Sequence, residues 1–187
     1  MNRPVYFITH PNVVISREVP VPRWPLSERG IQRMRKGLQQ PWVKDITAVY
    51  CSTEQKAIDG ARILADHLGL GFTEIEALGE NNRSATGFLP PDEFERVADQ
   101  FFAQPEVSVR GWERAIDAQR RVVKAVEGLT GSTIAIVSHG AVGTLLYCHL
   151  TGKKIDRCWD QPANSGGNYF RFTLEPKAAH SWWTPID

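Results

Sequence analysis

The stretch Val5-Tyr6-Phe7-Ile8-Thr9-His10-Pro11 decides how the rest of the sequence is interpreted. Its apolar and aromatic residues predict a short buried strand. Because a residue that precedes proline is pushed toward extended backbone geometry, we expect the strand to stop at His10. The imidazole then stands at the carboxyl end of the strand, which is the end of an open parallel sheet where ligands bind. One such histidine alone is also compatible with a half-buried structural role.

A second predicted strand ends in the same way. The run from Thr133 to Val137 is apolar and rich in β-branched residues, and it leads directly into Ser138-His139-Gly140. Apolar residues at helical spacing then continue to Leu150. Two strands therefore end in a histidine at a strand-to-helix junction, which favours a functional site over two unrelated structural histidines.

The rest of the chain alternates between strand-like runs and helical repeats. Further strands are expected at 46–51, 72–76 and 168–174, with an edge strand at 180–183 in the tail. Helices are expected from Ser27 to just before Pro41, and at 54–68, 92–102 and 111–129, the last being the longest. Ser27 is the expected cap of the first helix, and Ser52 or Thr53 of the second. This alternation predicts an α/β fold with a mostly parallel central sheet between two layers of helices.

Bulk properties narrow the class of protein. The 187 residues favour one domain over 1–187, with a loop and helix excursion at about 77–110. A net charge of +1 gives no electrostatic basis for binding nucleic acid or an acidic membrane surface. No apolar run is long enough to span a bilayer, and the first residues lack the features of a signal peptide. Three cysteines without a Cys-x-x-Cys pair indicate reduced thiols, so we expect a cytoplasmic protein.

Two irregular loops and one helix start are candidates for lining a pocket. The proline-rich loop 12–25 leaves the His10 strand and carries Arg17 and Arg23. The polar loop 77–91 carries Glu80 and Arg83. Loops at the ends of strands often carry binding residues. Lys56 lies in the first turn of the 54–68 helix, and a strand followed by a turn and a helix N-terminus is a natural anion site.

These motifs, in this order, resemble the histidine phosphatase superfamily, also called phosphoglycerate mutase-like, from Val5 to about Leu174. The family's Arg-His-Gly motif appears as Thr9-His10-Pro11, and its Pro-Leu-Thr-x-x-Gly helix start appears as Pro25-Leu26-Ser27-Glu28-Arg29-Gly30. Its Ser-x-x-x-Arg-Ala motif appears as Ser52-Thr53-Glu54-Gln55-Lys56-Ala57, and its Leu-x-Glu segment as Leu78-Gly79-Glu80. Its second histidine motif appears as Val137-Ser138-His139-Gly140, and its late asparagine loop as Asn164-Ser165-Gly166-Gly167.

The resemblance implies a phosphoglycerate mutase-like fold and a metal-independent phosphatase without a cofactor. His10 is implied to be the nucleophile that forms a phosphohistidine, and Glu80 the group that protonates the leaving oxygen and then takes a proton from water. His139 and Lys56 are implied to hold the phosphoryl oxygens, together with backbone N–H groups near Ser138 to Gly140. Thr9, at the position of a family arginine, is a further candidate for phosphate binding. The implied partner is a small phosphorylated molecule or a phosphoprotein.

The sequence departs from the family pattern beside the nucleophile. Thr9 and Lys56 stand where the family has arginines, and Pro11 lacks a backbone N–H. A lysine keeps the charge of an arginine but not its bidentate geometry. Losing one preorganised donor to a developing oxyanion typically costs about 100- to 1000-fold in rate.

Three explanations of this departure stay open. A loop arginine restores the lost charge, from among Arg17, Arg23 and Arg83. Alternatively, the substrate is not a simple phosphomonoester. In the third explanation, the protein has little or no activity and binds phosphate, a phosphorylated ligand or a protein partner in the same cleft. A phosphatase is favoured over a mutase, because a mutase must rebind a phosphorylated product in a tight cationic pocket.

Overall fold

The central feature of the fold is a seven-stranded sheet, seen in the computed structural model that describes residues 3–187. Its strands are β1 (Pro4–Thr9), β2 (Ala48–Cys51), β3 (Phe72–Glu74), β4 (Ile134–Ser138), β5 (Asn168–Leu174), β6 (Lys177–Ala179) and β7 (Thr184–Pro185). The order across the sheet is β3-β2-β4-β1-β5-β6, and β7 pairs with β5. Strands β3, β2, β4 and β1 are parallel, whereas β5, β6 and β7 add antiparallel pairs at the other side.

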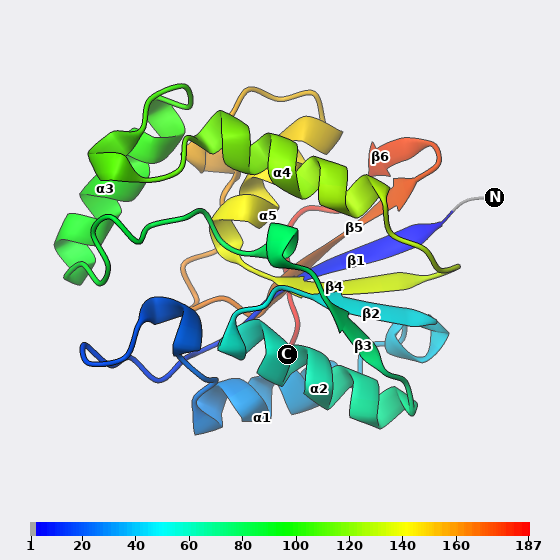
Figure 1. Cartoon of the computed structure of the whole chain (residues 1–187). Helices are drawn as coiled ribbons and strands as arrows, with labels where there is room; N and C mark the ends of the chain where they lie inside the picture. The colour runs from blue at the N-terminus through cyan, green and yellow to red at the C-terminus, as the bar shows by residue number, and fades with distance from the viewer. Residues whose placement is uncertain (1–2) are drawn as a thin grey trace.

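Helices cover both faces of this sheet. They are α1 (Glu28–Gly37), α2 (Gln55–Leu68), α4 (Ala115–Glu127) and α5 (Gly140–Leu150), whereas α3 (Pro91–Ala103) lies beyond the ends of the strands. Figure 1 shows α1 and α2 on one face and α4 and α5 on the other. The predicted three-layer α/β/α arrangement with a mostly parallel sheet is therefore confirmed. Within the described residues, no helix combines the length and apolarity needed to cross a bilayer.

Strand β1 lies inside the sheet and serves both cores. Phe7 packs in the cluster that includes Leu145 of α5, while Ile8 packs in the cluster that includes Met34 of α1. Both β1 side chains have no exposed surface. A strand buried on both faces needs apolar residues at consecutive positions rather than alternate ones, which explains the continuous run at Val5 to Ile8. Full burial of a side chain of this size contributes about 1.5–3 kcal/mol.

Two helix starts differ from the prediction. Helix α4 begins at Ala115 and not at Gly111, because Gly111 has a φ angle of 80° and the backbone is extended at Trp112 and Arg114. With 13 residues it is one shorter than α2, so it is not the longest helix. Helix α2 has Glu54 as its N-cap without a side-chain capping bond, so neither Ser52 nor Thr53 caps it. The α1 cap is as predicted: the Ser27 hydroxyl accepts the Gly30 N–H at 3.2 Å.

The tail also differs from the prediction. Residues 180–183 form no strand, and the edge strands β6 and β7 lie on either side of them. Trp183 turns inward and is buried, whereas Trp182 is exposed. Trp183 thus packs against Phe7 of β1 and Phe170 of β5, which are inner strands of the sheet.

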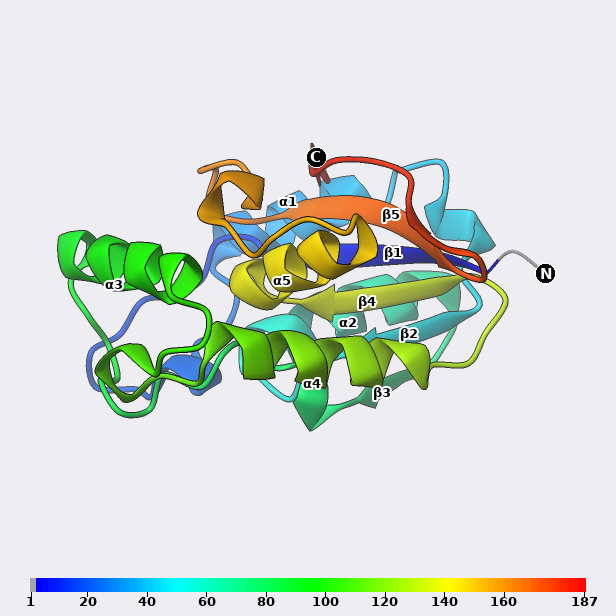
Figure 2. The ribbon, with the colours of Figure 1, turned by 90° about the horizontal axis from the view of Figure 1, so that it is seen from above.

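The carboxyl ends of the parallel strands carry the chain's irregular segments. The loop after β1, which includes the short helix η1 (Val21–Arg23), and helix α3 both lie beyond these ends in both views (Figure 1 and Figure 2). The segment after β3 forms the short helix η3 (Glu76–Leu78) and leads to the Glu80 loop. Because β1 and β4 are parallel neighbours, with Thr9 opposite Ser138, the next residues of both strands meet at this edge.

Candidate active site

His10 and His139 face each other at the carboxyl ends of β1 and β4. Their ring centroids are 5.2 Å apart, with an angle of 67° between the ring planes. The His10 N–H extends the strand pairing by donating to the Ser138 carbonyl at 3.1 Å. The sheet itself therefore fixes the separation of the two rings.

The ring of His10 is oriented by its own loop. Its Nδ1 lies 3.0 Å from the Pro11 carbonyl oxygen, and because a carbonyl can only accept, Nδ1 carries the proton of the neutral ring. Burial, followed by the positive charge of Lys56, lowers the pKa of His10 to about 4. At neutral pH the Nε2 atom of His10 therefore has a free electron pair.

The ring of His139 is buried, and its polar contacts come from the residues that follow β2, the other neighbour of β4. Its Nε2 lies 2.6 Å from the Ser52 hydroxyl and 3.4 Å from the Glu54 carboxylate. The Ser52 oxygen also accepts the Glu54 N–H at 3.3 Å, so this hydroxyl links the His139 ring to the start of α2. Within residues 3–187 the Nδ1 atom of His139 has no hydrogen-bond partner. Burial lowers the pKa of His139 well below its usual range, against the opposing effect of Glu54.

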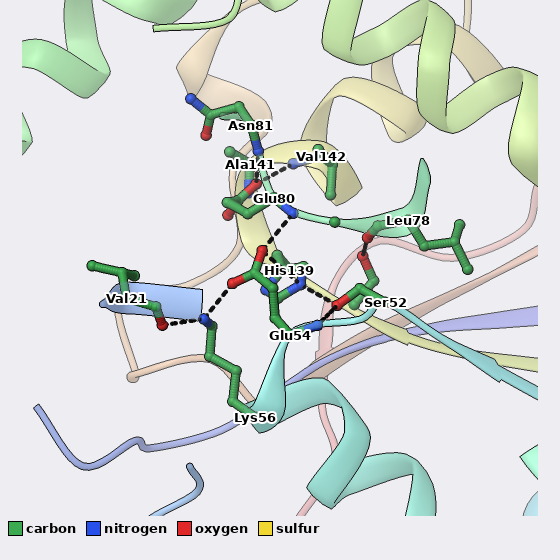
Figure 3. Close-up of polar contacts among 12 residues, drawn as sticks. Val21, Ser52, Glu54, Lys56, Leu78, Glu80, Asn81, His139, Ala141 and Val142 are labelled. Carbon is green, nitrogen blue, oxygen red and sulfur yellow. Dashed lines mark hydrogen bonds and ion pairs between the residues drawn. The ribbon is translucent and has the colours of Figure 1, made fainter. Parts of the chain in front are cut away.

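Glu54 places a carboxylate at the centre of the site, as Figure 3 shows. One of its oxygens forms an ion pair with the buried Lys56 ammonium, and the other accepts the Glu80 N–H at 2.9 Å. Burial by itself would raise the pKa of Glu54, but the charges of His139 and Lys56 outweigh it and lower the pKa to about 2. Lys56 also donates to the Val21 carbonyl at 3.0 Å, so η1 and α2 meet at this ammonium.

The Glu80 carboxylate lies at the N-terminus of α5 (Figure 3). It accepts the N–H groups of Ala141 at 3.2 Å and Val142 at 3.1 Å, and that of Asn81 at 3.2 Å. These bonds favour the ionised carboxylate, but burial outweighs them and raises the pKa of Glu80. A carboxyl of this kind keeps its proton to a higher pH than a solvated one, as a general acid requires.

The Glu80 loop is clamped from α4. Arg121 donates to the carbonyl oxygens of Ala77, Gly79 and Glu80 at 2.9, 3.0 and 3.2 Å. The same guanidinium pairs with Glu113 through two bonds of 2.9 and 2.8 Å. A planar guanidinium can hold several acceptors in one fixed geometry, so Arg121 sets the path of the backbone that presents Glu80.

Thr9 is buried at the end of β1, and its hydroxyl joins an amide network. Its hydroxyl donates to the Gln161 side-chain oxygen at 2.7 Å and accepts the Asn168 N–H at 3.0 Å. The Asn168 side chain donates to the same Gln161 oxygen at 2.9 Å. Thr9 therefore contacts Gln161 and not the space between the two histidines.

The three loop arginines are placed differently. Arg83 packs over the rings of Phe94 and Trp112, 5.1 and 5.6 Å from their centroids. Its charge is close enough to contribute to the pKa shifts of His10, Glu80 and His139. Arg17 lies 5.5 Å from the Phe88 ring centroid, and Arg23 is an exposed residue of η1.

The structure thus brings His10, Glu80, His139 and Lys56 together, with Gly140 at the start of α5 beside them. Sequence reasoning missed Glu54, Gln161 and the Arg121 clamp. Glu54 lies two positions before Lys56 in the sequence, but nothing in the local pattern predicts that its side chain turns inward. Within residues 3–187, no group of three or more His, Cys, Asp or Glu side chains is placed to hold a metal ion.

The comparison with protein families agrees with this pair of strand-end histidines on an α/β sheet. The histidine phosphatase superfamily (branch 1) matches residues 6–182 of the chain, which therefore belongs to this superfamily. Among curated protein sequences, no relative matches the chain.

Solved structures with the same fold cover nearly the whole chain. The mycobacterial glucosyl-3-phosphoglycerate phosphatase has a TM-score of 0.80 at 16% identity, covering 98% of this chain and 99% of that one. YhfR of Bacillus stearothermophilus has a TM-score of 0.79 at 24% identity, covering 99% and 100%. Phosphoserine phosphatase of Entamoeba histolytica, solved with 3-phosphoglyceric acid, has a TM-score of 0.76 at 16% identity, covering 97% of each chain. At these identities the likeness shows the fold.

Proposed function

We propose that the protein is a phosphatase that acts through a phosphohistidine on His10. The observation that carries this proposal is the ring pair at 5.2 Å, in which Pro11 fixes the His10 tautomer and leaves Nε2 unprotonated. An oriented, neutral imidazole is the form that can attack phosphorus. The reaction uses the chain's own side chains, without a cofactor.

The proposed reaction has two steps. In the first, Nε2 of His10 forms a bond to phosphorus while the ester P–O bond breaks, and protonated Glu80 gives its proton to the leaving oxygen. In the second, the Glu80 carboxylate takes a proton from water as the water oxygen bonds to phosphorus and the N–P bond breaks. Phosphate leaves, and both His10 and Glu80 return to their starting protonation states.

Four groups are proposed to hold the phosphoryl oxygens. His139 would donate from Nδ1, Gly140 from its backbone N–H, and Lys56 and Arg83 would supply positive charge. Support comes from the unpartnered, buried Nδ1 of His139 and from the closeness of Arg83 to both histidines. Arg17 and Arg23, on the loop after β1, are proposed to contact the rest of the substrate, and Thr9 acts through its neighbours.

The proposed substrate is a small phosphorylated molecule or a phosphoprotein. The structural neighbours include a glucosyl-3-phosphoglycerate phosphatase and a phosphoserine phosphatase, which supports a phosphorylated organic substrate. We further propose that 1–187 acts as one domain with a loop and helix excursion at about 77–110. The three free cysteines, of which Cys158 is exposed, support a reducing, cytoplasmic location.

A second candidate function is binding of a phosphorylated ligand or partner without turnover. Thr9 and Pro11 beside His10 favour it, because the Thr9 hydroxyl bonds to Gln161 and Pro11 has no backbone N–H, so neither supplies a donor to a developing oxyanion. A binding protein would show affinity for inorganic phosphate at this site but no release of phosphate from esters.

A panel of phosphomonoesters tests the two candidates. The wild-type protein should release phosphate from at least one ester, and His10→Ala should reduce the rate by about a thousandfold or more. His67→Ala, at an exposed histidine of α2, is the matched control and should retain full activity. Phosphate binding with no turnover of any ester would support the second candidate and contradict the first.

A further inference from the structure

The positive charge of Lys56 is already balanced inside the candidate site (Figure 3). Its buried ammonium forms an ion pair with one oxygen of Glu54 and donates to the Val21 carbonyl, which leaves one of the three N–H donors of an ammonium for a ligand. The second Glu54 oxygen accepts the Glu80 N–H at 2.9 Å and lies 3.4 Å from Nε2 of His139. Moving this carboxylate aside would leave the Glu80 N–H without that acceptor, so we expect Glu54 to stay beside Lys56 when a ligand binds.

The residues next to His10 supply no further positive charge. Thr9 is uncharged and its hydroxyl bonds to Gln161, while Pro11 lacks a backbone N–H. Burial lowers the pKa of His10 to about 4 and that of His139 well below its usual range, so both imidazoles are neutral at neutral pH. The two histidines therefore offer a phosphoryl group a nucleophile and hydrogen bonds, but no charge.

Three charged side chains act most strongly on the two histidines, among the residues that the structure describes. They are Lys56, Glu54 and Arg83. Against the effect of burial, the pKa of Glu54 is lowered to about 2, so its carboxylate is ionised at neutral pH. With the proton on Glu80 that the first step requires, these groups leave one net positive charge. That charge balances a phosphoryl group with one negative charge, but not the second charge of a dianion.

We propose that the site prefers a phosphoryl group with a single negative charge, which makes phosphodiesters its preferred class of substrate. This inference rests on the His10 chemistry proposed above and names a substrate class for it. A phosphodiester has one negative charge because both of its ester oxygens are uncharged. An uncharged ester oxygen needs neither a cation nor an N–H donor, which fits Thr9 and Pro11 at the positions beside the nucleophile.

The two proposed steps apply to a diester with the same groups acting. Nε2 of His10 forms a bond to phosphorus while one ester P–O bond breaks, and Glu80 gives its proton to the leaving alcohol oxygen. Water then bonds to phosphorus as the N–P bond breaks, and Glu80 takes a proton from the water. The product is a phosphate monoester, which gains a second negative charge by losing a proton to solvent. Because the site does not balance that second charge, the monoester leaves and is not cleaved again.

Two ligands that cannot be hydrolysed test the charge preference by calorimetry. Phenylphosphonate carries two negative charges at mildly alkaline pH, whereas methyl(phenyl)phosphinate, with a methyl group in place of one oxygen, carries one. We expect the wild-type protein to bind the phosphinate about tenfold more tightly, the effect of one unbalanced charge in a partly solvated site. Equal affinities, or tighter binding of the phosphonate, would overturn the proposal.

The role of Glu54 in this preference requires a variant. Glu54→Gln should shift the ratio of the two affinities about tenfold toward the phosphonate, because the charge of Lys56 is then no longer cancelled. Glu127→Gln is the matched control, since Glu127 also pairs with a lysine, Lys177, but at the surface. It should leave the ratio unchanged. The same ratio in Glu54→Gln as in the wild type would overturn the role of Glu54.

Hydrolysis by the wild-type protein gives a second test, which holds even if Glu54→Gln does not fold. Methyl phenyl phosphate should be cleaved to phenol and methyl phosphate with a higher kcat/KM than phenyl phosphate at the same mildly alkaline pH. Methyl phosphate should accumulate, and His10→Ala should abolish the reaction. A higher kcat/KM for phenyl phosphate would contradict the diester preference.

Failure of this inference is distinct from failure of the proposed function. Tighter phosphonate binding in a protein that hydrolyses monoesters through His10 would overturn the charge preference and leave the phosphatase supported. Tighter phosphinate binding in a protein that cleaves no ester would support the charge preference and contradict the phosphatase.

Discussion

The carboxylate of Glu54 forms an ion pair with the buried ammonium of Lys56 inside the candidate active site. Its second oxygen lies 3.4 Å from His139 Nε2 and accepts the Glu80 N–H. A negative charge here opposes the binding of a phosphoryl group, while the same carboxylate orders three of the proposed functional residues. Glu54 therefore lowers the affinity of the site for anions but fixes the positions of Lys56, His139 and Glu80.

Replacing this carboxylate by an amide should make the site a stronger anion binder. We expect Glu54→Gln to bind inorganic phosphate about tenfold more tightly, because Lys56 loses its internal counterion. The affinity should also depend more steeply on salt. Calorimetry at two ionic strengths measures both effects, and Glu93→Gln, which loses only a surface pair with Arg110, is the control. Weaker phosphate binding in Glu54→Gln would show that Glu54 mainly supports the site.

Loss of the Arg121 clamp should affect catalysis more than binding. Arg121→Met frees the carbonyls of Ala77, Gly79 and Glu80, so the Glu80 carboxyl loses its fixed position. Because small misplacements of a catalytic group are costly, we expect kcat to fall about 10- to 100-fold with little change in phosphate affinity. Arg120→Met on the same helix is the control, since that side chain is 71% exposed and faces Asp117. Equal kinetics of the two variants would contradict a positioning role for Arg121.

The plot of kcat/KM against pH should have an acid limb set by His10 and an alkaline limb set by Glu80. Activity needs neutral His10, whose pKa burial lowers to about 4, so the acid limb should lie near pH 4. It also needs protonated Glu80, whose pKa burial raises, so the alkaline limb should lie above the range of a solvated carboxyl. Glu80→Gln should lower kcat and remove the alkaline limb. An unchanged alkaline limb in that variant would exclude Glu80 as its origin.

The buried histidines should make the fold sensitive to mild acid. The pKa of His10 is lower in the folded chain than its ordinary value of 6.5. The unfolded chain therefore binds more protons below pH 6.5, and stability is lost as the pH falls from there toward 4. His10 alone should cost about 2 kcal/mol between pH 7 and pH 5, and His139 acts in the same direction.

Urea unfolding at pH 7 and pH 5 measures this loss. His10→Asn should lose less stability between the two pH values than the wild type does, whereas His67→Asn, at an exposed position, should behave like the wild type. Identical pH dependence in wild type and His10→Asn would show that His10 is not held neutral by the fold.

The parts of the fold that sequence predicts are those set by local pattern. The apolar run before His10 and the similar run before His139 predict two buried strands, and their parallel pairing brings the rings together. The start of α4 was not predictable, because Trp112 fits the helical spacing although the backbone at Gly111, Trp112 and Arg114 is not helical. The missed cap of α2 has the same kind of cause: Ser52 bonds to His139, a partner 87 positions away.

The residues of the candidate site also fall into a predictable group and an unpredictable one. Strand-end residues could be predicted, since the strand itself places them. Glu54, Gln161 and Arg121 could not, because their roles depend on partners brought from distant segments. Gln161 in particular is defined by Thr9, on a strand more than 150 positions earlier in the chain.

The most direct test of the central claim is the capture of the phosphoenzyme. The protein is mixed with a phosphate ester labelled in its phosphoryl group, quenched under conditions that preserve phosphohistidine, and digested for mass spectrometry. The account predicts label on the peptide that carries His10, and none in His10→Ala. Turnover of the ester with label on another residue, or with no protein-bound label in the wild type at any time, would contradict it.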